Sequence, residues 1–314
     1  MDHVKSLKCL ICGREYRPDQ VEYVCPLHGE EGILDVQYDY GLIGRRISPK
    51  TLAEDRNYTI WRYKPLLPIA PDSPVTPLAT GWTPLYRADR LAAGLGLRHV
   101  WVKDDGRQPS ASFKDRASAI AVVKGRERKA RIITTASTGN AAAALAVQCA
   151  SVEQANVIFV PESAPPAKIA QLLVFGSTVI LVRGTYDDAF ELCGQAAKEF
   201  GWYNRNTGYN PYMTEGKKTA SLEICEQLGW DADAVDLFAL HQVSELHTQE
   251  LARAVGFDLS KAFLIYPELG NVGPASVPIV LSKALEAERI APGDRIVLGG
   301  IGSGLNCTVA GIVW

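Results

Sequence analysis

The sequence predicts an α/β protein built around a parallel sheet, with a small additional element at its N-terminus. From about residue 99 onward, short apolar runs alternate with helical runs, which is typical of parallel strands covered by helices. The 314 residues are 47% hydrophobic and carry a formal net charge of -2, enough to bury a large core in two domains. Three of the seven cysteines cluster near the N-terminus, which points to the additional element.

Composition also narrows the class of protein. The near-neutral charge gives no electrostatic case for nucleic-acid binding, and no apolar run approaches membrane-spanning length. The N-terminus lacks the apolar core of a secretory signal. An odd number of cysteines, mostly scattered, is typical of reduced thiols rather than of a disulfide framework. We therefore expect a cytoplasmic protein with no nucleic-acid partner and no membrane partner.

Two short knuckles near the N-terminus have metal-ligand spacing. Cys9-Leu10-Ile11-Cys12 and Cys25-Pro26-Leu27-His28 lie about a dozen residues apart, as in a zinc ribbon, here over residues 1–34. The four ligands would be Cys9, Cys12, Cys25 and His28. Because such a set is closed, the zinc would be structural rather than catalytic. The alternative is three buried cysteines with an incidental histidine.

The remaining elements follow in chain order. Residues 35–77 lack regular periodicity, and we expect them to wrap a larger domain. Strands are predicted at 99–103, 131–135, 156–160 and 178–182. Helices are predicted from Ser112, after Asn140, and over 167–175 and 186–200. The last of these has amphipathic spacing, with one face formed by Phe190, Cys193, Ala197 and Phe200.

The loop before the first of these helices carries an unusual lysine. Ser112 followed by Asp115 is a capping-box pattern, which places Lys114 in the first helical turn. The positive end of the helix dipole and partial burial both favour the neutral amine. Neutral lysines are nucleophiles that form Schiff bases. The alternative is a solvated surface lysine beside Asp115 and Arg116.

A second loop has the features of an anion-binding turn. The run Thr135-Ala136-Ser137-Thr138-Gly139-Asn140 passes from a strand through a glycine into an alanine-rich helix. It offers backbone N–H groups, hydroxyls and an amide at a helix N-terminus, which suits anionic or phenolate oxygens. Ligands bind at this edge of a parallel sheet, at the carboxyl ends of the strands. The alternative is an ordinary N-cap turn.

These two loops resemble a known family. The segment 103–116, which ends in Ser-Phe-Lys-Asp-Arg, and the ASTGN run at 136–140 resemble the threonine synthase family of fold-type-II pyridoxal-phosphate enzymes. The resemblance extends over about residues 1–232 through the ribbon-like start, GWTPLY at 81–86, PESAPPAK at 161–168 and NRNTGYNPYMTEGKKT at 204–219. Two positions depart from the family pattern: His28 stands where cysteine is commoner, and Ala111 where glycine is usual.

The resemblance implies roles for individual residues. Lys114 would hold pyridoxal 5'-phosphate covalently and move protons at the substrate's Cα and Cβ. Phe113 would shape the ring site, and Asn140 would hydrogen-bond the ring's phenolic oxygen. Ser137 and Thr138 would hold the substrate carboxylate or phosphate. The implied partner is a phospho-amino acid, O-phosphohomoserine, which would be converted to threonine and phosphate.

The substrate phosphate needs cationic partners. The matched segments offer four candidates, Lys168, Arg205, Lys217 and Lys218. For Lys217 and Lys218, a solvated surface charge is an equally good interpretation.

After residue 232 a different resemblance begins. The glycine-rich loop that cradles the cofactor phosphate does not follow, nor does the later Ser or Thr at the pyridine nitrogen. Residues 234–314 instead resemble the C-terminal end of ketoacyl synthase III (OleA-type) condensing enzymes of the thiolase fold. There, residues matching His241 and Asn271 form an oxyanion site, and an earlier cysteine carries the acyl group. Because the segment with that cysteine is missing, we expect His241 and Asn271 to be remnants.

The expected architecture is therefore a zinc-ribbon-like element at 1–34, a truncated pyridoxal-phosphate region at 35–232 and a thiolase-fold fragment at 233–314. Three functions stay open: a lyase whose tail supplies substitute strands, an acyl-condensing protein, and a non-catalytic fusion. In the first, Gly299–Gly302 would replace the phosphate cradle. Two half-folds leave strand edges uncovered, so we expect poor solubility or oligomers, such as a homodimer, unless the tail docks on the sheet.

Overall fold

Packing divides the chain into two compact units. The computed structural model describes residues 1–95, 98–229, 234–242, 245, 248–249, 252, 258–270, 272, 275–302 and 306–314. The first unit consists of Met1–Trp82 and Asp105–Thr219, and the second consists of Thr83–Asp104 and Ala220–Trp314. Each unit therefore joins segments that are far apart in the sequence.

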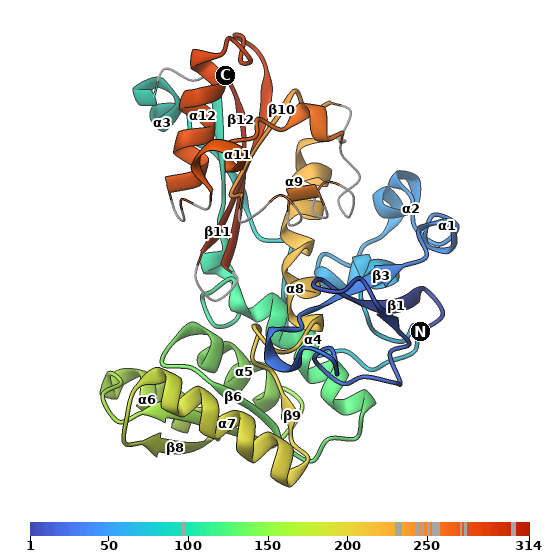
Figure 1. Cartoon of the computed structure of the whole chain (residues 1–314), viewed down its shortest axis with the longest axis vertical. Helices are drawn as coiled ribbons and strands as arrows, with labels where there is room; N and C mark the ends of the chain where they lie inside the picture. Colours follow the sequence, from blue (N-terminus) through green and yellow to red (C-terminus); the bar gives the residue numbers. More distant parts are fainter. Residues whose placement is uncertain are drawn as a thin grey trace. The chain divides into compact units, whose positions relative to one another are not determined.

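The first unit begins with a small antiparallel sheet in the order β2-β1-β3, of which Figure 1 labels β1 and β3. Its strands are β1 (Val4–Cys9), β2 (Glu15–Tyr16) and β3 (Leu34–Tyr38). Alternate residues of β3 are buried, which is the period-two pattern of a strand with one covered face. This face packs in the same core as helix α4 (Lys114–Glu127), so the N-terminal element is part of the first unit's core.

The chain after β3 covers that core with short helices. They are α1 (Tyr40–Ile43), α2 (Pro49–Glu54) and η2 (Ile60–Leu66). Ser48 and Thr51 form a reciprocal capping box that begins α2. Short, separately capped helices explain why residues 35–77 show no long periodicity.

A four-stranded parallel sheet forms much of the rest of this unit, in the order β8-β7-β6-β9. Its strands are β6 (Ile133–Ala136), β7 (Asn156–Pro161), β8 (Thr178–Val182) and β9 (Tyr203–Asn204). Every residue of β6 and β7 is buried, as in parallel strands covered on both faces. The accompanying helices are α4, α5 (Asn140–Ala150), α6 (Pro166–Val174), α7 (Tyr186–Phe200) and α8 (Tyr212–Lys217). The predicted α/β fold with a parallel sheet is confirmed.

Helix α7 has the predicted bounds, and its predicted buried face is right in part. Cys193 and Ala197 are buried, and Phe190 is half-buried. The prediction was wrong for Phe200, which is 64% exposed. Phe200 is the last residue before Gly201, whose φ of +65° ends the helix, and its ring lies against Trp202 at 5.1 Å between centroids instead of against the core.

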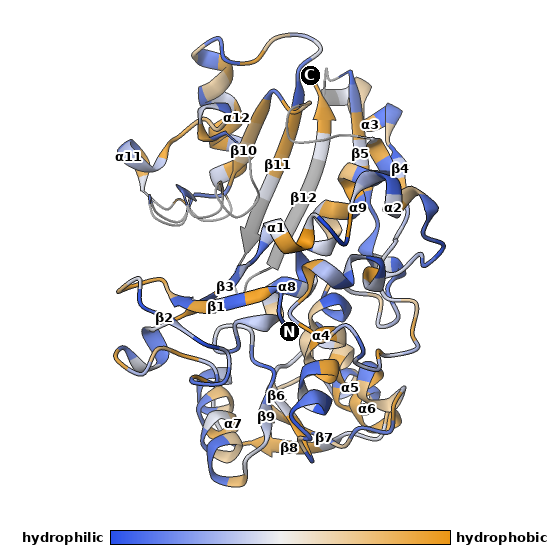
Figure 2. Cartoon of the chain, turned by 90° about the vertical axis from the view of Figure 1, so that its right-hand side faces the viewer, coloured by the Kyte–Doolittle hydropathy of each residue, from blue (hydrophilic) through white to orange (hydrophobic). Residues whose placement is uncertain are grey.

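The second unit contains a mixed five-stranded sheet in the order β10-β11-β12-β5-β4. Its strands are β4 (Leu85–Arg87), β5 (His99–Lys103), β10 (Leu237–Leu240), β11 (Arg295–Gly302) and β12 (Asn306–Val313). β10 and β11 pair in parallel, and the other pairs are antiparallel. Its helices are α3 (Asp89–Leu95), α9 (Thr219–Leu228), η4 (Leu259–Lys261), α11 (Tyr266–Leu269) and α12 (Ser276–Glu286). In the coloured parts of β11 and β12, Figure 2 shows mainly hydrophobic residues.

Strand β12 joins the C-terminal segment to β5. Ile312 pairs with Val100, and the two side chains share one buried cluster with residues of β10, β11 and α12. Lys103, at the end of β5, forms a buried 2.7 Å ion pair with Glu223 of α9. The expectation that strand 99–103 belongs to the parallel sheet was wrong, because both neighbours of β5 run antiparallel to it and lie in this second sheet.

Two sequence-based expectations about the tail change with the structure. The packing boundaries differ from the expected domain boundaries, since residues 83–104 and 220–229 pack with the tail. Residues Gly299–Gly302 lie in β11 and pair in register with Asn306–Val309 of β12. An extended strand does not form the concave turn of N–H groups that holds a phosphate, so the substitute-cradle hypothesis was wrong for these residues.

Candidate functional site

Helix α4 begins at Lys114, directly after a tight turn. Ala111 has a φ of +55°, in the left-handed region that L-residues rarely adopt. The Oγ of Ser112 accepts the N–H of Lys114 at 3.3 Å. The Asp115 carboxylate accepts two hydrogen bonds from Ser110, one from its N–H at 3.0 Å and one from its Oγ at 2.5 Å. The predicted Ser112–Asp115 capping box was therefore wrong, because the Oγ of Ser112 accepts from Lys114 instead of from the N–H of Asp115.

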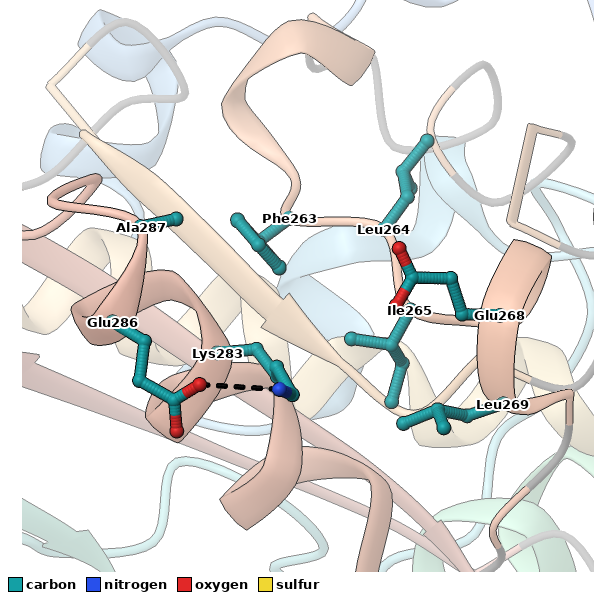
Figure 3. Close-up of a pocket in the computed structure, with 8 residues that line it drawn as sticks. All are labelled: Phe263, Leu264, Ile265, Glu268, Leu269, Lys283, Glu286 and Ala287. Carbon is teal, nitrogen blue, oxygen red and sulfur yellow. Dashed lines mark hydrogen bonds and ion pairs between the residues drawn. The ribbon is translucent and has the colours of Figure 1, made fainter.

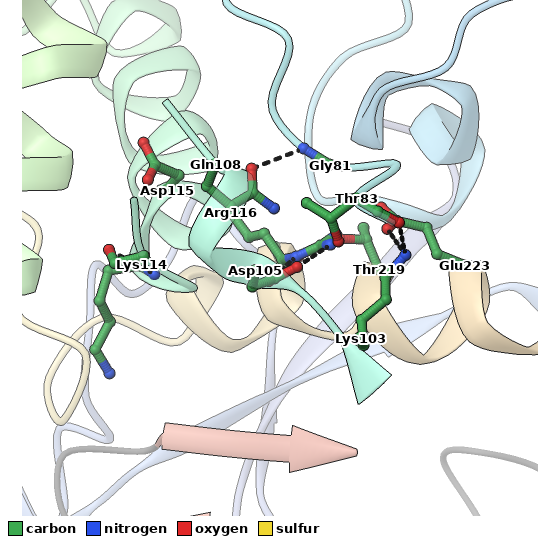
Figure 4. Close-up of polar contacts among 12 residues, drawn as sticks. Gly81, Thr83, Lys103, Asp105, Gln108, Lys114, Asp115, Arg116, Thr219 and Glu223 are labelled. Atoms are coloured by element: carbon green, nitrogen blue, oxygen red, sulfur yellow. Dashed lines mark hydrogen bonds and ion pairs between the residues drawn. The ribbon is translucent and has the colours of Figure 1, made fainter. Parts of the chain in front are cut away.

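The amine of Lys114 is buried, and the described part of the chain offers it no partner. Among the described residues, nothing donates to or accepts from its Nζ. Burial, and second the charge of Arg205, lower the pKa of Lys114 from 10.5 to about 8. Figure 4 shows the side chain extending away from the polar contacts around Asp105 and Arg116. A neutral amine at near-physiological pH is the form that reacts with aldehydes.

The first turn of α4 is held by Arg116. Its buried guanidinium donates to both carboxylate oxygens of Asp105, at 2.7 and 2.9 Å, and to the Thr219 hydroxyl at 2.8 Å (Figure 4). Such two-pronged pairing fixes orientation as well as distance. Gly216 of α8 lies so close that a Cβ there would sit 2.2 Å from the carbonyl oxygen of Arg116. These contacts leave the backbone at Lys114 little room to move.

Arg205 supplies a buried positive charge beside this turn. Its Nε donates to the Oγ of Ser118 and its Nη1 to the Oγ1 of Thr207, both at 3.2 Å. Within the described part of the chain, its Nη2 has no hydrogen-bond partner, and the charges of Tyr186 and Asp115 favour its cationic form. Burial lowers the pKa of Arg205 to about 10, so it stays charged at neutral pH. A buried cation with a spare donor is favourable only when an anion joins it.

Several other predicted residues follow strands of the parallel sheet, near the carboxyl ends of those strands. Ser137, Thr138 and Asn140 follow β6, and Arg205 follows β9, the parallel neighbour of β6. The half-buried Ser137 uses its Oγ to accept the N–H of Gly139 at 3.2 Å, whereas Thr138 and Asn140 are exposed. Lys168, on α6 after β7, is half-buried. This agrees with ligand binding at the carboxyl ends of parallel strands.

Three more predicted site residues, and one that was not predicted, complete the description of the site. Phe113 is half-buried and directly precedes α4. Lys217 is buried, and Lys218 forms a 2.5 Å ion pair with Glu215, so neither is the solvated surface charge weighed from the sequence. Sequence reasoning missed Ser118, which supports Arg205. The available signal was its position four residues after Lys114, one helical turn further along the same face.

The N-terminal knuckles come together as predicted. The ligand atoms of Cys9, Cys12, Cys25 and His28 all lie within 4.8 Å of one another. His28 directs Nδ1 towards the sulfur of Cys25 at 3.4 Å, and the Tyr16 hydroxyl contacts that sulfur at 3.2 Å. Although burial opposes it, the hydrogen bonds from Tyr16 and His28 lower the pKa of Cys25 to about 6. Three thiols and an imidazole, one thiol already favouring the thiolate, suit a tetrahedral zinc ion.

The second unit carries the other predicted residues. His241 is buried directly after β10, and its backbone N–H donates to the Gly299 carbonyl at 2.7 Å. Asn271 lies outside the described residues. In place of a glycine-rich loop, Gln242 follows the strand and accepts the N–H groups of Ile265 and Tyr266. A cavity of about 300 Å³ lies between α11 and α12, lined by residues such as Phe263, Leu269 and the ion pair Lys283–Glu286 (Figure 3). None of the described residues that line it is a predicted site residue.

No helix in the described part of the chain combines the length and hydrophobicity needed to cross a membrane.

Comparison with known proteins finds two family models. Residues 76–241 match the model for pyridoxal-phosphate dependent enzymes, and residues 225–314 match the model for the C-terminal part of 3-oxoacyl-[acyl-carrier-protein] synthase III.

Individual relatives show the same division. A threonine synthase of Methanocaldococcus jannaschii is 37% identical over 71% of this chain and 54% of its own length. An acyl-CoA:acyl-CoA alkyltransferase of Xanthomonas campestris pv. campestris is 54% identical over 32% of this chain and 31% of its own length. A crystal structure of Xanthomonas campestris OleA is 48% identical over 31% of this chain and 28% of that one, with a TM-score of 0.30.

The chain thus spans about half the length of the threonine synthase it matches, and about a third of the alkyltransferase. The expected junction of two enzyme-derived segments is confirmed. Because the first model covers 166 of the 314 residues, the chain belongs to the family of pyridoxal-phosphate-dependent enzymes, and it carries a C-terminal segment related to 3-oxoacyl-[acyl-carrier-protein] synthase III.

Proposed function

We propose that the chain is a pyridoxal-phosphate-dependent lyase that converts O-phosphohomoserine and water to threonine and phosphate. One observation carries this proposal. Lys114 presents a buried amine with a pKa of about 8 and no partner among the described residues, next to the buried guanidinium of Arg205, whose Nη2 has no hydrogen-bond partner among those residues. A nucleophilic amine and a buried cation are the two groups needed to hold an aldehyde cofactor and an anionic substrate.

When bound, the cofactor supplies an electron sink for negative charge that develops on the substrate's carbons. Lys114 would hold it covalently and, once released by the substrate's amine, accept and return protons at Cα and Cβ. A pKa near the working pH lets the same Nζ act as base and as acid. Arg116, clamped to Asp105, would keep that Nζ in place through the first turn of α4.

The anionic groups would be held by the residues at the sheet edge. Arg205 would donate its spare Nη2 to the substrate phosphate, with Lys168 as a second cation. Ser137 and Thr138 would bind the substrate carboxylate, and Asn140 would donate to the cofactor's phenolic oxygen. Phe113 would pack against the cofactor ring.

The proposal includes a structural zinc ion in a ribbon over residues 1–34. Cys9, Cys12, Cys25 and His28 would hold it, and the donor set leaves no open position for a substrate. The ion would fasten β1 to the turn that follows Cys25. Its role would be to stabilise the fold rather than to take part in the reaction.

A second candidate is acyl condensation, which the similarity of residues 225–314 favours. It needs a reactive thiol, and two of the cysteines outside the knuckles are poorly suited to that role. Burial raises the pKa of Cys193 to about 11, and burial also raises the pKa of Cys149. Thiols with raised pKa values are weak nucleophiles. Covalent labelling of any cysteine by an acyl-CoA would nevertheless revive this candidate.

The test of the proposed function is phosphate release. The full chain is incubated with pyridoxal phosphate and O-phosphohomoserine, and phosphate and threonine are measured together. We expect equal amounts of both, lost in Lys114→Ala and kept in Lys198→Ala, which alters an exposed lysine of α7. Phosphate release that survives Lys114→Ala, or no turnover by a chain that binds the cofactor, would refute the proposed reaction. The second result would leave the non-catalytic fusion as the better account.

A further inference from the structure

Tyr23 connects the N-terminal element to the strand that leads to Arg205. It lies between the two cysteine knuckles and is only 7% exposed. Its hydroxyl oxygen accepts the backbone N–H of Asn204 at 2.9 Å. Its ring packs against Tyr203 at 5.9 Å and against Tyr209 at 5.0 Å between centroids. The contact thus joins residues 181 positions apart in the chain.

The accepted N–H lies on an open edge of the parallel sheet. β9 is an outer strand, and Tyr203 and Arg205 direct their N–H groups inward, to the carbonyls of Ile132 and Thr134. In an extended strand the N–H of the residue between them points the opposite way. Asn204 is 2% exposed, so water does not satisfy this donor, and the Tyr23 hydroxyl does.

Arg205 directly follows Asn204 in the chain. Its backbone is fixed by the bond to Thr134 at 2.8 Å on one side and by the Tyr23–Asn204 contact one residue earlier. The side chain then reaches Ser118 and Thr207, with Nη2 left over. An orphaned N–H at Asn204 would favour a shift of the strand end, and the guanidinium would move with it.

We propose that Tyr23 is a positioning residue for Arg205, acting through the backbone of Asn204, and thereby sets how tightly the site beside Lys114 binds a phosphate group. The inference rests on the proposed role of Arg205 as the anion-binding cation. The cation of Arg128, 5.8 Å above both the Tyr23 and the Tyr203 ring and paired with Glu22, holds the two rings together. The N-terminal element then contributes to the site without touching the substrate.

The test compares Tyr23→Phe with Tyr209→Phe in the full chain without cofactor. Both variants remove one hydroxyl from the same aromatic cluster, but only Tyr23 contacts Asn204. Lys114 is labelled with an amine-reactive reagent over a range of pH and of inorganic phosphate, and its modification is measured by mass spectrometry. The measurement yields the pKa of Lys114 and the phosphate concentration that protects it by half.

We expect Tyr23→Phe to raise the half-protecting phosphate concentration about tenfold, and Tyr209→Phe to change it less than about twofold. Without phosphate, Tyr23→Phe should also raise the pKa of Lys114, because a displaced Arg205 repels the ammonium form less. A purely structural role of Tyr23 would lower the melting temperature and leave that pKa unchanged.

Each outcome of this labelling test decides for or against the role of Tyr23. Unchanged protection and an unchanged Lys114 pKa in a folded Tyr23→Phe chain would overturn the inference and leave the proposed function standing. If phosphate protects Lys114 in no chain, the anion-binding role of Arg205 fails, and the pKa comparison alone decides whether Tyr23 positions it. Should Tyr23→Phe not fold, Tyr23→Met also removes the hydroxyl and fills the space with a flexible apolar side chain. An unchanged Lys114 pKa in that variant would count against the inference.

Discussion

Lys114 combines two influences on one amine, burial and the nearby charge of Arg205, and both lower its pKa to about 8. Its rate of Schiff-base formation with pyridoxal phosphate should therefore rise through about pH 8 and level off above it. Over pH 8 to 10.5 the unfolded lysine keeps a proton that the native one has lost, so stability should rise with pH in that window.

The matched variant is Arg205→Gln, which removes the repelling charge and leaves the burial. It should move the midpoint of the rate profile upward, without reaching 10.5, because burial is the larger cause. Rapid-mixing absorption measurements across pH give both midpoints. A wild-type midpoint near that of an ordinary lysine would contradict this account of the site.

Ala111 offers a second test at the scale of one residue. Its φ of +55° is strained for an L-residue, and its side chain is exposed, so Ala111→Gly removes strain without leaving a cavity. We expect the free energy of unfolding in urea to increase by roughly 1 kcal/mol. Ala167→Gly, in the exposed part of α6, should instead decrease it by about 0.5 to 1 kcal/mol. Equal effects of the two substitutions would show that Ala111 is not strained.

The N-terminal element supplies a test at the scale of a secondary-structure group. If its four ligand atoms hold zinc, the purified chain should contain close to one zinc per chain, measured by elemental analysis. Cys25→Ser should lose the metal, since a serine hydroxyl is a poor ligand for zinc, whereas Cys225→Ser should keep it. A metal-free wild-type chain that melts at the same temperature with and without a chelator would refute the zinc site.

Local patterns predicted several elements well and their partners poorly. The bounds of β8 and α7 follow from a short apolar run and from 3.6-residue spacing between clear caps, all of which are local. Strand 99–103 was also located correctly, but its sheet was not. Its neighbour β12 lies more than 200 residues away, and nothing in the run itself records the direction of that partner.

The candidate site shows the same limit. Lys114 and the loop of Ser137 to Asn140 could be picked out because strand-turn-helix patterns mark them. Arg205 was found only through resemblance, and its support by Ser118 depends on how β9 packs against α4. The four candidate ligands of the cysteine knuckles could be named because the spacing within each knuckle is local.

For the whole molecule, the C-terminal segment completes a sheet that begins with residues 83–104. The tail thus pairs with the edge of β5 in the second unit. Ile312, 2% exposed, is the side chain of β12 that pairs with Val100 and enters the second unit's core. Ile312→Ala should lower the free energy of unfolding by roughly 2 to 5 kcal/mol, and the exposed Leu285→Ala by less than about 1.

Hydrogen exchange measured by mass spectrometry checks the location of that effect. Ile312→Ala should speed exchange in residues 99–103 as well as in β12, since the two strands share backbone pairing. Faster exchange confined to the tail would mean that the tail is not part of a sheet with β5.

Visible absorption of the full chain, recorded after addition of pyridoxal phosphate and removal of the excess, tests most directly whether Lys114 binds the cofactor. We expect a cofactor band in the wild-type chain and in Lys198→Ala, and no band in Lys114→Ala. Peptide mapping after borohydride reduction should place the cofactor on Lys114. A wild-type chain without the band, or a band that persists in Lys114→Ala, would contradict the assignment of Lys114 as the cofactor-binding residue.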